Sequence, residues 1–153
     1  MSLAQPNHSL ADEQRVHRRR TVVVADDDEA VRTALVELLS DVAAFRVVAA
    51  GGDADAAIVL CHQFRPEILL VDVNMPAGGG ERAARIVARE LPDTVIVALS
   101  GRADRGTRRR MLAAGADAFV AKGSTDDLIT LLAAAHHSVE HHSPFRTATG
   151  RDS

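Results

Sequence analysis

The stretch that decides the fold is Glu67-Ile68-Leu69-Leu70-Val71-Asp72, a run of apolar residues that ends in an acid. A second apolar run, residues 21–25, is followed in the same way by Asp26 and Asp27. An ionised carboxylate at the end of a buried strand costs free energy unless another group binds it. The pattern therefore predicts a site that holds a divalent cation and carries out phosphate chemistry.

Strand-like segments alternate with helix-like segments along the chain. The apolar runs predict strands at about residues 21–25, 45–50, 67–71, 94–99 and 117–121. Between them apolar residues recur at helical spacing, as Val31, Leu35 and Leu38 do in the first helix. Such alternation predicts right-handed crossovers and a parallel sheet. We therefore expect an α/β, flavodoxin-like, doubly wound (βα)5 fold whose five-stranded parallel sheet has the order 2-1-3-4-5.

That strand order brings five polar side chains to one edge of the sheet. Strands one and three are neighbours, and ligands of such sheets bind where the topology reverses between them. Asp26, Asp27 and Asp72 fall at this point. Ser100 and Lys122 end the next two apolar runs and reach the same edge. We expect the five side chains to converge.

The composition predicts one cytoplasmic domain. A chain of 153 residues can bury an ordinary core, here an aliphatic one because it has four Phe and no Trp or Tyr. We expect a disordered tail at residues 1–19, the domain at 20–138, and a polar tail or linker start at 139–153. The net charge of −3 gives no basic field for nucleic acid. No stretch is long enough to span a membrane, and the lone Cys61, expected to be a small buried or half-buried hydrophobe, fits a reducing compartment.

Three carboxylates in one place repel one another unless a cation lies among them. At about 5 Å and an effective dielectric near 20, each pair repels by roughly 3 kcal/mol. Mg²⁺, which prefers oxygen ligands, removes this repulsion, and Lys122 compensates in part without it. A carboxylate can then attack phosphorus to form an acyl phosphate. Asp72 is the expected nucleophile because it stands alone on the central strand, while Ser100 donates a hydrogen bond.

Four segments together resemble a bacterial two-component response-regulator receiver domain. They are Val24-Ala25-Asp26-Asp27-Asp28, Leu69-Leu70-Val71-Asp72-Val73-Asn74-Met75-Pro76 with Gly80, Ala98-Leu99-Ser100-Gly101, and Ala113-Ala114-Gly115-Ala116-Asp117-Ala118-Phe119-Val120-Ala121-Lys122. The resemblance covers about residues 20–138. Lys122 followed by Gly123 resembles the branch of the family that often carries a helix-turn-helix DNA-binding output domain.

The resemblance implies a role for each residue of the site. Asp72 accepts a phosphoryl group from a sensor histidine kinase or a phosphotransfer protein. Asp27, Asp72 and the backbone carbonyl of Asn74 ligate Mg²⁺, and Asp26 contributes largely through water. Lys122 pairs with the phosphoryl group. The protein would catalyse only its own phosphorylation and dephosphorylation, so it would not be an enzyme acting on a separate substrate.

The resemblance also implies a two-state switch. Ser100 moves towards the phosphoryl group, and Phe119 turns inward in concert. These movements reshape the surface formed by the fourth helix, the fifth strand and the fifth helix. That surface engages partners or a second copy of the chain in the family.

The sequence departs from the family pattern at three positions near the site. Gly123 follows Lys122 where the family has a cis proline, and a cis bond without proline costs about 2.5–4 kcal/mol, so the sequence leaves this bond's conformation open. Asp28 adds a fourth acid, which we expect to cap the first helix rather than to bind metal. Phe119 replaces the common Tyr.

Two other functions are compatible with the sequence. A haloacid-dehalogenase-type aspartate-nucleophile phosphatase would use Asp26 and Asp28 as its Asp-x-Asp pair, although Ala30 stands where that family has Thr or Val. A docking module of the same fold would leave the phosphate chemistry idle.

Two further motifs favour ordinary structural roles. A basic stretch at the fourth helix is expected to be a solvated face, with a partner surface as the alternative; it comprises Arg102, Arg105, Arg108, Arg109 and Arg110. Residues 137–141 match the zinc-protease pattern His-x-x-Glu-His, but we expect no metal there because no third ligand accompanies it.

Overall fold

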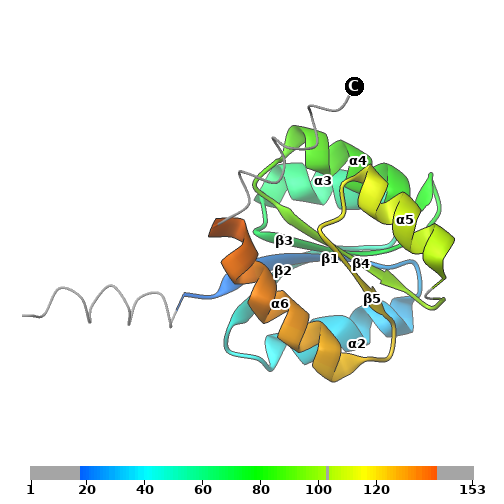
Figure 1. The fold of residues 1–153 in the computed structure, drawn as a ribbon. Coiled ribbons are helices and arrows are strands. Elements are labelled where there is room, and N and C mark those ends of the chain that lie inside the picture. Colours follow the sequence, from blue (N-terminus) through cyan, green and yellow to red (C-terminus); the bar gives the residue numbers. More distant parts are fainter. Residues whose placement is uncertain (1–17, 103, 141–153) are drawn as a thin grey trace, which may run out of the picture.

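A single parallel sheet forms the centre of the protein (Figure 1). The computed structural model describes residues 18–102 and 104–140, the last six of these in their backbone only. The strands are β1 (Arg20–Ala25), β2 (Phe45–Gly51), β3 (Ile68–Asp72), β4 (Val95–Ser100) and β5 (Ala118–Ala121). They pair in the order β2-β1-β3-β4-β5. The predicted fold class and strand order are confirmed, and every predicted strand boundary lies within one residue of the observed one.

Helices cover both faces of the sheet. They are α2 (Glu29–Ser40), α3 (Ala54–Phe64), α4 (Gly79–Glu90), α5 (Arg105–Ala114) and α6 (Thr125–Glu140). Figure 1 shows α2 and α6 on one face and α3, α4 and α5 on the other. This is the arrangement that right-handed crossovers on both sides of a parallel sheet produce.

Alternating strand residues supply two separate hydrophobic cores. Val23 and Leu69 contribute to the cluster beneath α3, α4 and α5, whereas Val24 and Leu70 contribute to the cluster beneath α2 and α6. Every residue of β3 and β4 is buried, but the edge strands β2 and β5 are only partly buried. The continuous apolar runs of the sequence therefore mark the central strands, as expected for strands covered on both faces.

Local sequence signals set the helix ends. Asp28 caps α2, because its side chain accepts hydrogen bonds from the backbone N–H groups of Ala30 and Val31. This confirms the expected role of Asp28. At the C-cap of α5, Gly115 has φ = 120°, and a Cβ there would lie 2.5 Å from the Cβ of Ala88. Only glycine allows α5 to end this close to α4.

Several predicted features lie at the limits of the described residues. The predicted tail at residues 1–19 lies outside them apart from Arg18 and Arg19. The backbone of α6 continues to Glu140, and residues 141–153 are not described. The His-x-x-Glu-His pattern at 137–141 falls outside the described side chains. Among the helices that are described, none is long and apolar enough to cross a membrane.

The thiol of Cys61 should be inert in the folded protein. Cys61 is buried in α3, as predicted, and burial raises the pKa of its thiol to about 12. The thiol is therefore protonated at pH 8, and only the thiolate is nucleophilic. We expect a thiol-reactive dye to label Cys61 at pH 8 at least about a hundredfold more slowly in buffer than in denaturant. Labelling at equal rates would show that α3 does not pack as described.

Candidate functional site

The strand register places the predicted site residues at one edge of the sheet. Ala25 pairs with Val71, so Asp26 and Asp72 lie beside each other after neighbouring strands. Ser100 pairs with Ala121, the residue before Lys122. Lys122 is held there because its backbone N–H donates to the carbonyl of Ser100 at 2.8 Å. The parallel direction of the strands thus brings residues from four segments together.

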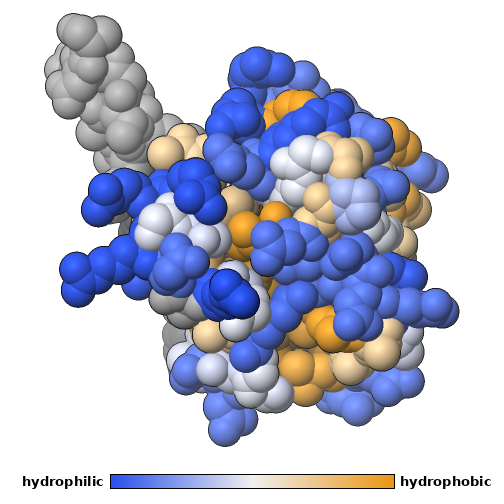
Figure 2. All heavy atoms as spheres, turned by 90° about the vertical axis from the view of Figure 1, so that its right-hand side faces the viewer, coloured by the Kyte–Doolittle hydropathy of each residue, from blue (hydrophilic) through white to orange (hydrophobic). Residues whose placement is uncertain are grey.

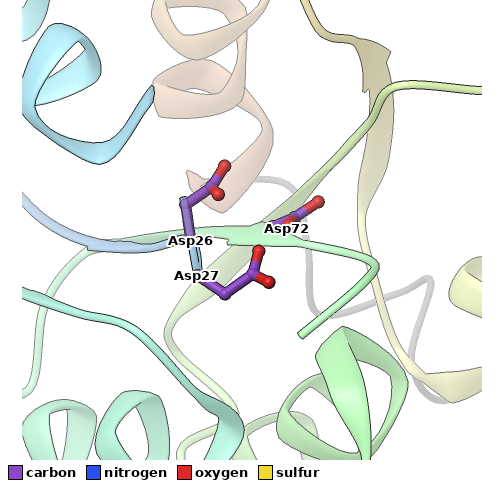
Figure 3. A group of neighbouring side chains, drawn as sticks. All are labelled: Asp26, Asp27 and Asp72. Atoms are coloured by element: carbon purple, nitrogen blue, oxygen red, sulfur yellow. The ribbon is translucent and has the colours of Figure 1, made fainter. Parts of the chain in front are cut away.

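Three carboxylates meet at this edge (Figure 3). One carboxylate oxygen from each of Asp26, Asp27 and Asp72 lies within 4.8 Å of the other two. Figure 3 shows the side chains extending from the ends of β1 and β3 towards a shared space. Asp26 is fully buried and Asp72 is 2% exposed, whereas Asp27 is exposed. A cation bound here would therefore contact protein oxygens on one side and keep water on the other.

The ammonium group of Lys122 lies between the two buried carboxylates. Its Nζ is 2.9 Å from Oδ2 of Asp26 and 3.1 Å from Oδ1 of Asp72. Burial alone would lower the pKa of Lys122, but the ion pairs with both carboxylates outweigh burial and raise it. Lys122 is therefore charged at neutral pH and neutralises part of the acidic cluster.

Burial is the largest influence on Asp72, and it raises the pKa of this carboxyl. The hydrogen bond from Lys122 lowers the pKa and the charge of Asp26 raises it, which leaves a value of about 6. Asp72 is consequently ionised for the most part at pH 7, but at a cost that a nearby cation relieves. A carboxylate can act as a nucleophile only when it is ionised and its negative charge is not fully neutralised by neighbouring groups.

Asp26 provides a separate test of whether a divalent cation fits. Its Oδ1 accepts a hydrogen bond from the backbone N–H of Asp28 at 2.9 Å. Its buried Oδ2 has the ion pair with Lys122 but accepts no well-oriented hydrogen bond within the described part of the chain. A buried carboxylate oxygen normally has such a donor. Mg²⁺ prefers hard carboxylate oxygens and usually keeps several water ligands. The available oxygen of Asp26 and the solvent-exposed carboxylate of Asp27 fit both requirements.

The remaining predicted residues lie near the carboxylates in different ways. The backbone N–H of Asn74 faces Oδ1 of Asp72 at 3.4 Å, so the Asn74 backbone lies beside this carboxylate. Ser100 is buried, but its hydroxyl donates to the carbonyl of Arg102 at 2.6 Å and accepts from the Arg102 N–H at 3.1 Å. Phe119 lies within β5 and is half-buried against the core beneath α3, α4 and α5.

The bond after Lys122 is trans, because the described residues contain no cis peptide. Gly123 has φ = 95°, and a Cβ there would meet nothing within 4 Å. The sequence left the conformation of the Lys122–Gly123 bond open; the bond is trans, and Gly123 adopts a left-handed conformation. The chain turns into α6 from this glycine.

Two supporting residues escaped the sequence analysis of the site's chemistry. Arg32 of α2 donates from Nη1 to the carbonyl of Asp26 at 2.7 Å, which fixes the backbone before Asp27. Gly80, noted in the sequence only as part of the family pattern, lets α4 approach β3: a Cβ would lie 2.3 Å from the carbonyl oxygen of Asp72. No sequence signal indicated the contact of Arg32.

The site opens onto a hydrophilic surface. In Figure 1 the strands run towards the right-hand side, where α2 and α5 begin. Figure 2 faces that side and shows mainly hydrophilic residues, with hydrophobic ones in small separate areas. The arginines of α5 are exposed, as predicted for a solvated helix face. A charged or polar ligand can therefore reach this edge through water.

Known proteins share both the sequence pattern and the fold. Residues 22–134 match the response regulator receiver domain family. The response regulator GacA of Pseudomonas viridiflava is 32% identical over 103 residues, which are 67% of this chain and 48% of GacA. The transcriptional regulatory protein DegU of Brevibacillus brevis is 30% identical over 108 residues, 71% of this chain and 46% of DegU. The chain spans about half the length of these relatives.

Solved structures agree with these matches. The signal receiver domain of the response regulator NarL from Mycobacterium tuberculosis has a TM-score of 0.74 and 26% identity, covering 77% of this chain and 96% of that one. A CheY-like receiver domain protein from Methanospirillum hungatei has the same fold, with a TM-score of 0.74 and 20% identity over 82% of this chain and all of that one. By sequence and by fold, this chain belongs to the response regulator receiver domain family.

Proposed function

We propose that the chain is the phosphoacceptor switch of a two-component system. Asp72 receives a phosphoryl group from a sensor histidine kinase or a phosphotransfer protein in a reaction that needs Mg²⁺. One observation carries the proposal: the carboxylate oxygens of Asp26, Asp27 and Asp72 lie within 4.8 Å of one another, with the ammonium of Lys122 against two of them. A carboxylate nucleophile, acidic oxygens that can hold a cation, and a nearby ammonium are the parts that phosphoryl transfer requires.

In this mechanism Asp72 is the nucleophile. One of its carboxylate oxygens forms a bond to phosphorus, while the bond from phosphorus to the donor breaks and the donor keeps the electron pair. Asp26, Asp27, Asp72 and the backbone carbonyl of Asn74 would hold Mg²⁺. When bound, the ion supplies positive charge that offsets the charge on the phosphoryl oxygens.

Lys122 controls access to the acceptor. Asp72 is only 2% exposed, and the Lys122 ammonium lies 3.1 Å from its Oδ1. The side chain of Lys122 is 25% exposed, so it has room to swing outward when a phosphoryl group approaches. The acyl phosphate then carries nearly two negative charges, and Lys122 pairs with them instead of with Asp26.

The switch begins at Ser100. In the structure its hydroxyl makes two hydrogen bonds to the backbone of Arg102, and we propose that this is the arrangement before phosphorylation. We propose that the phosphoryl oxygens attract the hydroxyl, that the loop between β4 and α5 follows, and that Phe119 turns further inward. The surface of α5, β5 and α6 changes as a result and engages a partner or a second copy of the chain.

The relatives support a proposal about the wider setting. Because DegU is named as a transcriptional regulatory protein and is about twice as long as the matched region, we propose a regulator of transcription that acts with a DNA-binding output domain. We propose that it works in the cytoplasm and turns over no separate substrate. The haloacid-dehalogenase alternative loses its basis, because the chain belongs to the receiver family and Asp28, the second acid of that motif, caps α2.

Phosphorylation should be visible in the intact mass. With Mg²⁺ and a small acyl phosphate, we expect a transient gain of one phosphoryl group, because the ionised oxygen of Asp72 attacks phosphorus. Asp72→Asn should show no gain. Asp93 is an exposed acid just before β4, at the opposite end of the strands from the site. The control variant Asp93→Asn should therefore gain the phosphoryl group as the unsubstituted protein does. If the mass of the unsubstituted protein did not change, the proposal would be wrong, and the alternative of a docking module without phosphate chemistry would be favoured.

Mg²⁺ binding should depend on Asp27 but not on its neighbour Asp28. Asp27→Asn removes a charged oxygen from the cluster, and we expect the dissociation constant measured by calorimetric titration to rise at least about tenfold. Asp28→Asn makes the same change in charge one residue away. Since asparagine caps a helix as well as aspartate does, this variant should fold normally and bind Mg²⁺ with little change. Equal losses in both variants would mean that only the overall charge matters.

A further inference from the structure

We infer that Arg82 is a positioning residue for the loop between β3 and α4 (residues 73–78), and through this loop for the cation site. The inference rests on the proposed function, because the loop carries Asn74, whose backbone carbonyl is proposed to ligate Mg²⁺. Arg82 lies on α4, ten positions after Asp72 in the sequence, and its side-chain hydrogen bonds in the described part of the chain go to Asp55 and Ala77 rather than to the site carboxylates.

Arg82 joins the loop to a second helix. Its Nη1 donates to Oδ1 of Asp55 at 2.7 Å and to the carbonyl of Ala77 at 3.0 Å. Asp55 lies in the first turn of α3, so a single guanidinium connects α4, the loop and α3. A charge-assisted bond to a carbonyl fixes the direction of that peptide group.

The contact with Arg82 stabilises a loop whose backbone conformation is unfavourable at Ala77. Ala77, Gly78 and Gly79 have φ of 64°, 96° and 68°, three successive left-handed residues. Such a conformation is unfavourable for alanine, and glycine offers no side chain to pack. The aliphatic part of Arg82 lies directly against the loop, because a Cβ on Gly78 would be 2.7 Å from its Cδ.

Two backbone hydrogen bonds complete the attachment of the loop. The N–H of Ala54 donates to the carbonyl of Pro76 at 3.2 Å, and the N–H of Gly80 donates to the carbonyl of Val73 at 2.9 Å. The first of these bonds again leads to α3. The position of Asn74 therefore depends on how the loop is held against α3, and Arg82 is the side chain that holds it.

The chain supplies a matched control for this contact. Arg85 lies about one turn further along α4, and its hydrogen bond within the described residues goes to Glu81, at 2.9 Å, rather than to the loop. Its side chain is 58% exposed and that of Arg82 is 43% exposed. Exposed ion pairs of this kind contribute little to global stability. Removal of either arginine should therefore leave the melting temperature similar, and only removal of Arg82 should alter the loop.

The test measures amide hydrogen exchange in the metal-free protein and Mg²⁺ affinity by titration. In Arg82→Ala we expect the amides of Ala54 and Gly80 to exchange at least about threefold faster, because the loop opens more often. We expect the Mg²⁺ dissociation constant to rise about two- to fivefold. Arg85→Ala should change neither quantity, and Arg82→Lys should recover part of both, since it keeps a charged donor.

The outcomes separate this inference from the proposed function. If the unsubstituted protein binds Mg²⁺ and Arg82→Ala matches Arg85→Ala in both exchange and affinity, the positioning role of Arg82 is wrong. If exchange at Ala54 and Gly80 rises but Mg²⁺ affinity is unchanged, the loop does not govern the cation site and the inference is again wrong. If the unsubstituted protein binds no Mg²⁺, the proposed function itself fails.

Discussion

The site depends on one shared ion pair, in which the ammonium of Lys122 holds the buried carboxylates of Asp26 and Asp72. Without this ammonium, two buried carboxylates of the same charge would oppose folding. The ion pairs do not fully satisfy the two carboxylates. Within the described residues, Oδ2 of Asp26 pairs with Lys122 but accepts no well-oriented hydrogen bond, and burial raises the pKa of Asp72 to about 6. Lys122 alone therefore makes the acidic cluster stable enough for the protein to fold, and a bound cation would stabilise the cluster further.

The parallel sheet makes this arrangement possible. All strands point the same way, so the residue after each strand arrives at a common edge, and the neighbouring positions of β1 and β3 bring their acids together. Helices on both faces bury the central strands β3 and β4 completely, and the polar side chains lie where these strands end. The close approach of α4 to β3 at Gly80 and the bond from Arg32 to Asp26 then fix the backbone around the carboxylates.

Sequence reasoning predicted the parts of this structure that periodicity and strand order determine. It predicted the strand order and the edge that carries Asp26, Asp72 and Lys122, because a parallel sheet leaves few alternatives once the strands are located. It also predicted the cap formed by Asp28, which depends on neighbouring residues alone. The hydrogen bonds of Ser100 with the backbone of Arg102 were not predicted, because the rotamer of a loop-facing hydroxyl depends on the finished packing. The same holds for Arg32, whose guanidinium reaches a carbonyl six residues away only after α2 has docked.

The position of β5 at the end of the sheet has a mechanical consequence. β5 has four residues and is hydrogen-bonded to β4 alone, and Lys122 follows it directly. The positive charge of the site therefore follows a short strand at the side of the sheet, whereas Asp26 and Asp72 lie at the ends of the inner strands β1 and β3. A displacement of Lys122 would therefore disturb one ladder of hydrogen bonds at the side of the sheet, next to the start of α6, and would leave the buried central strands in place.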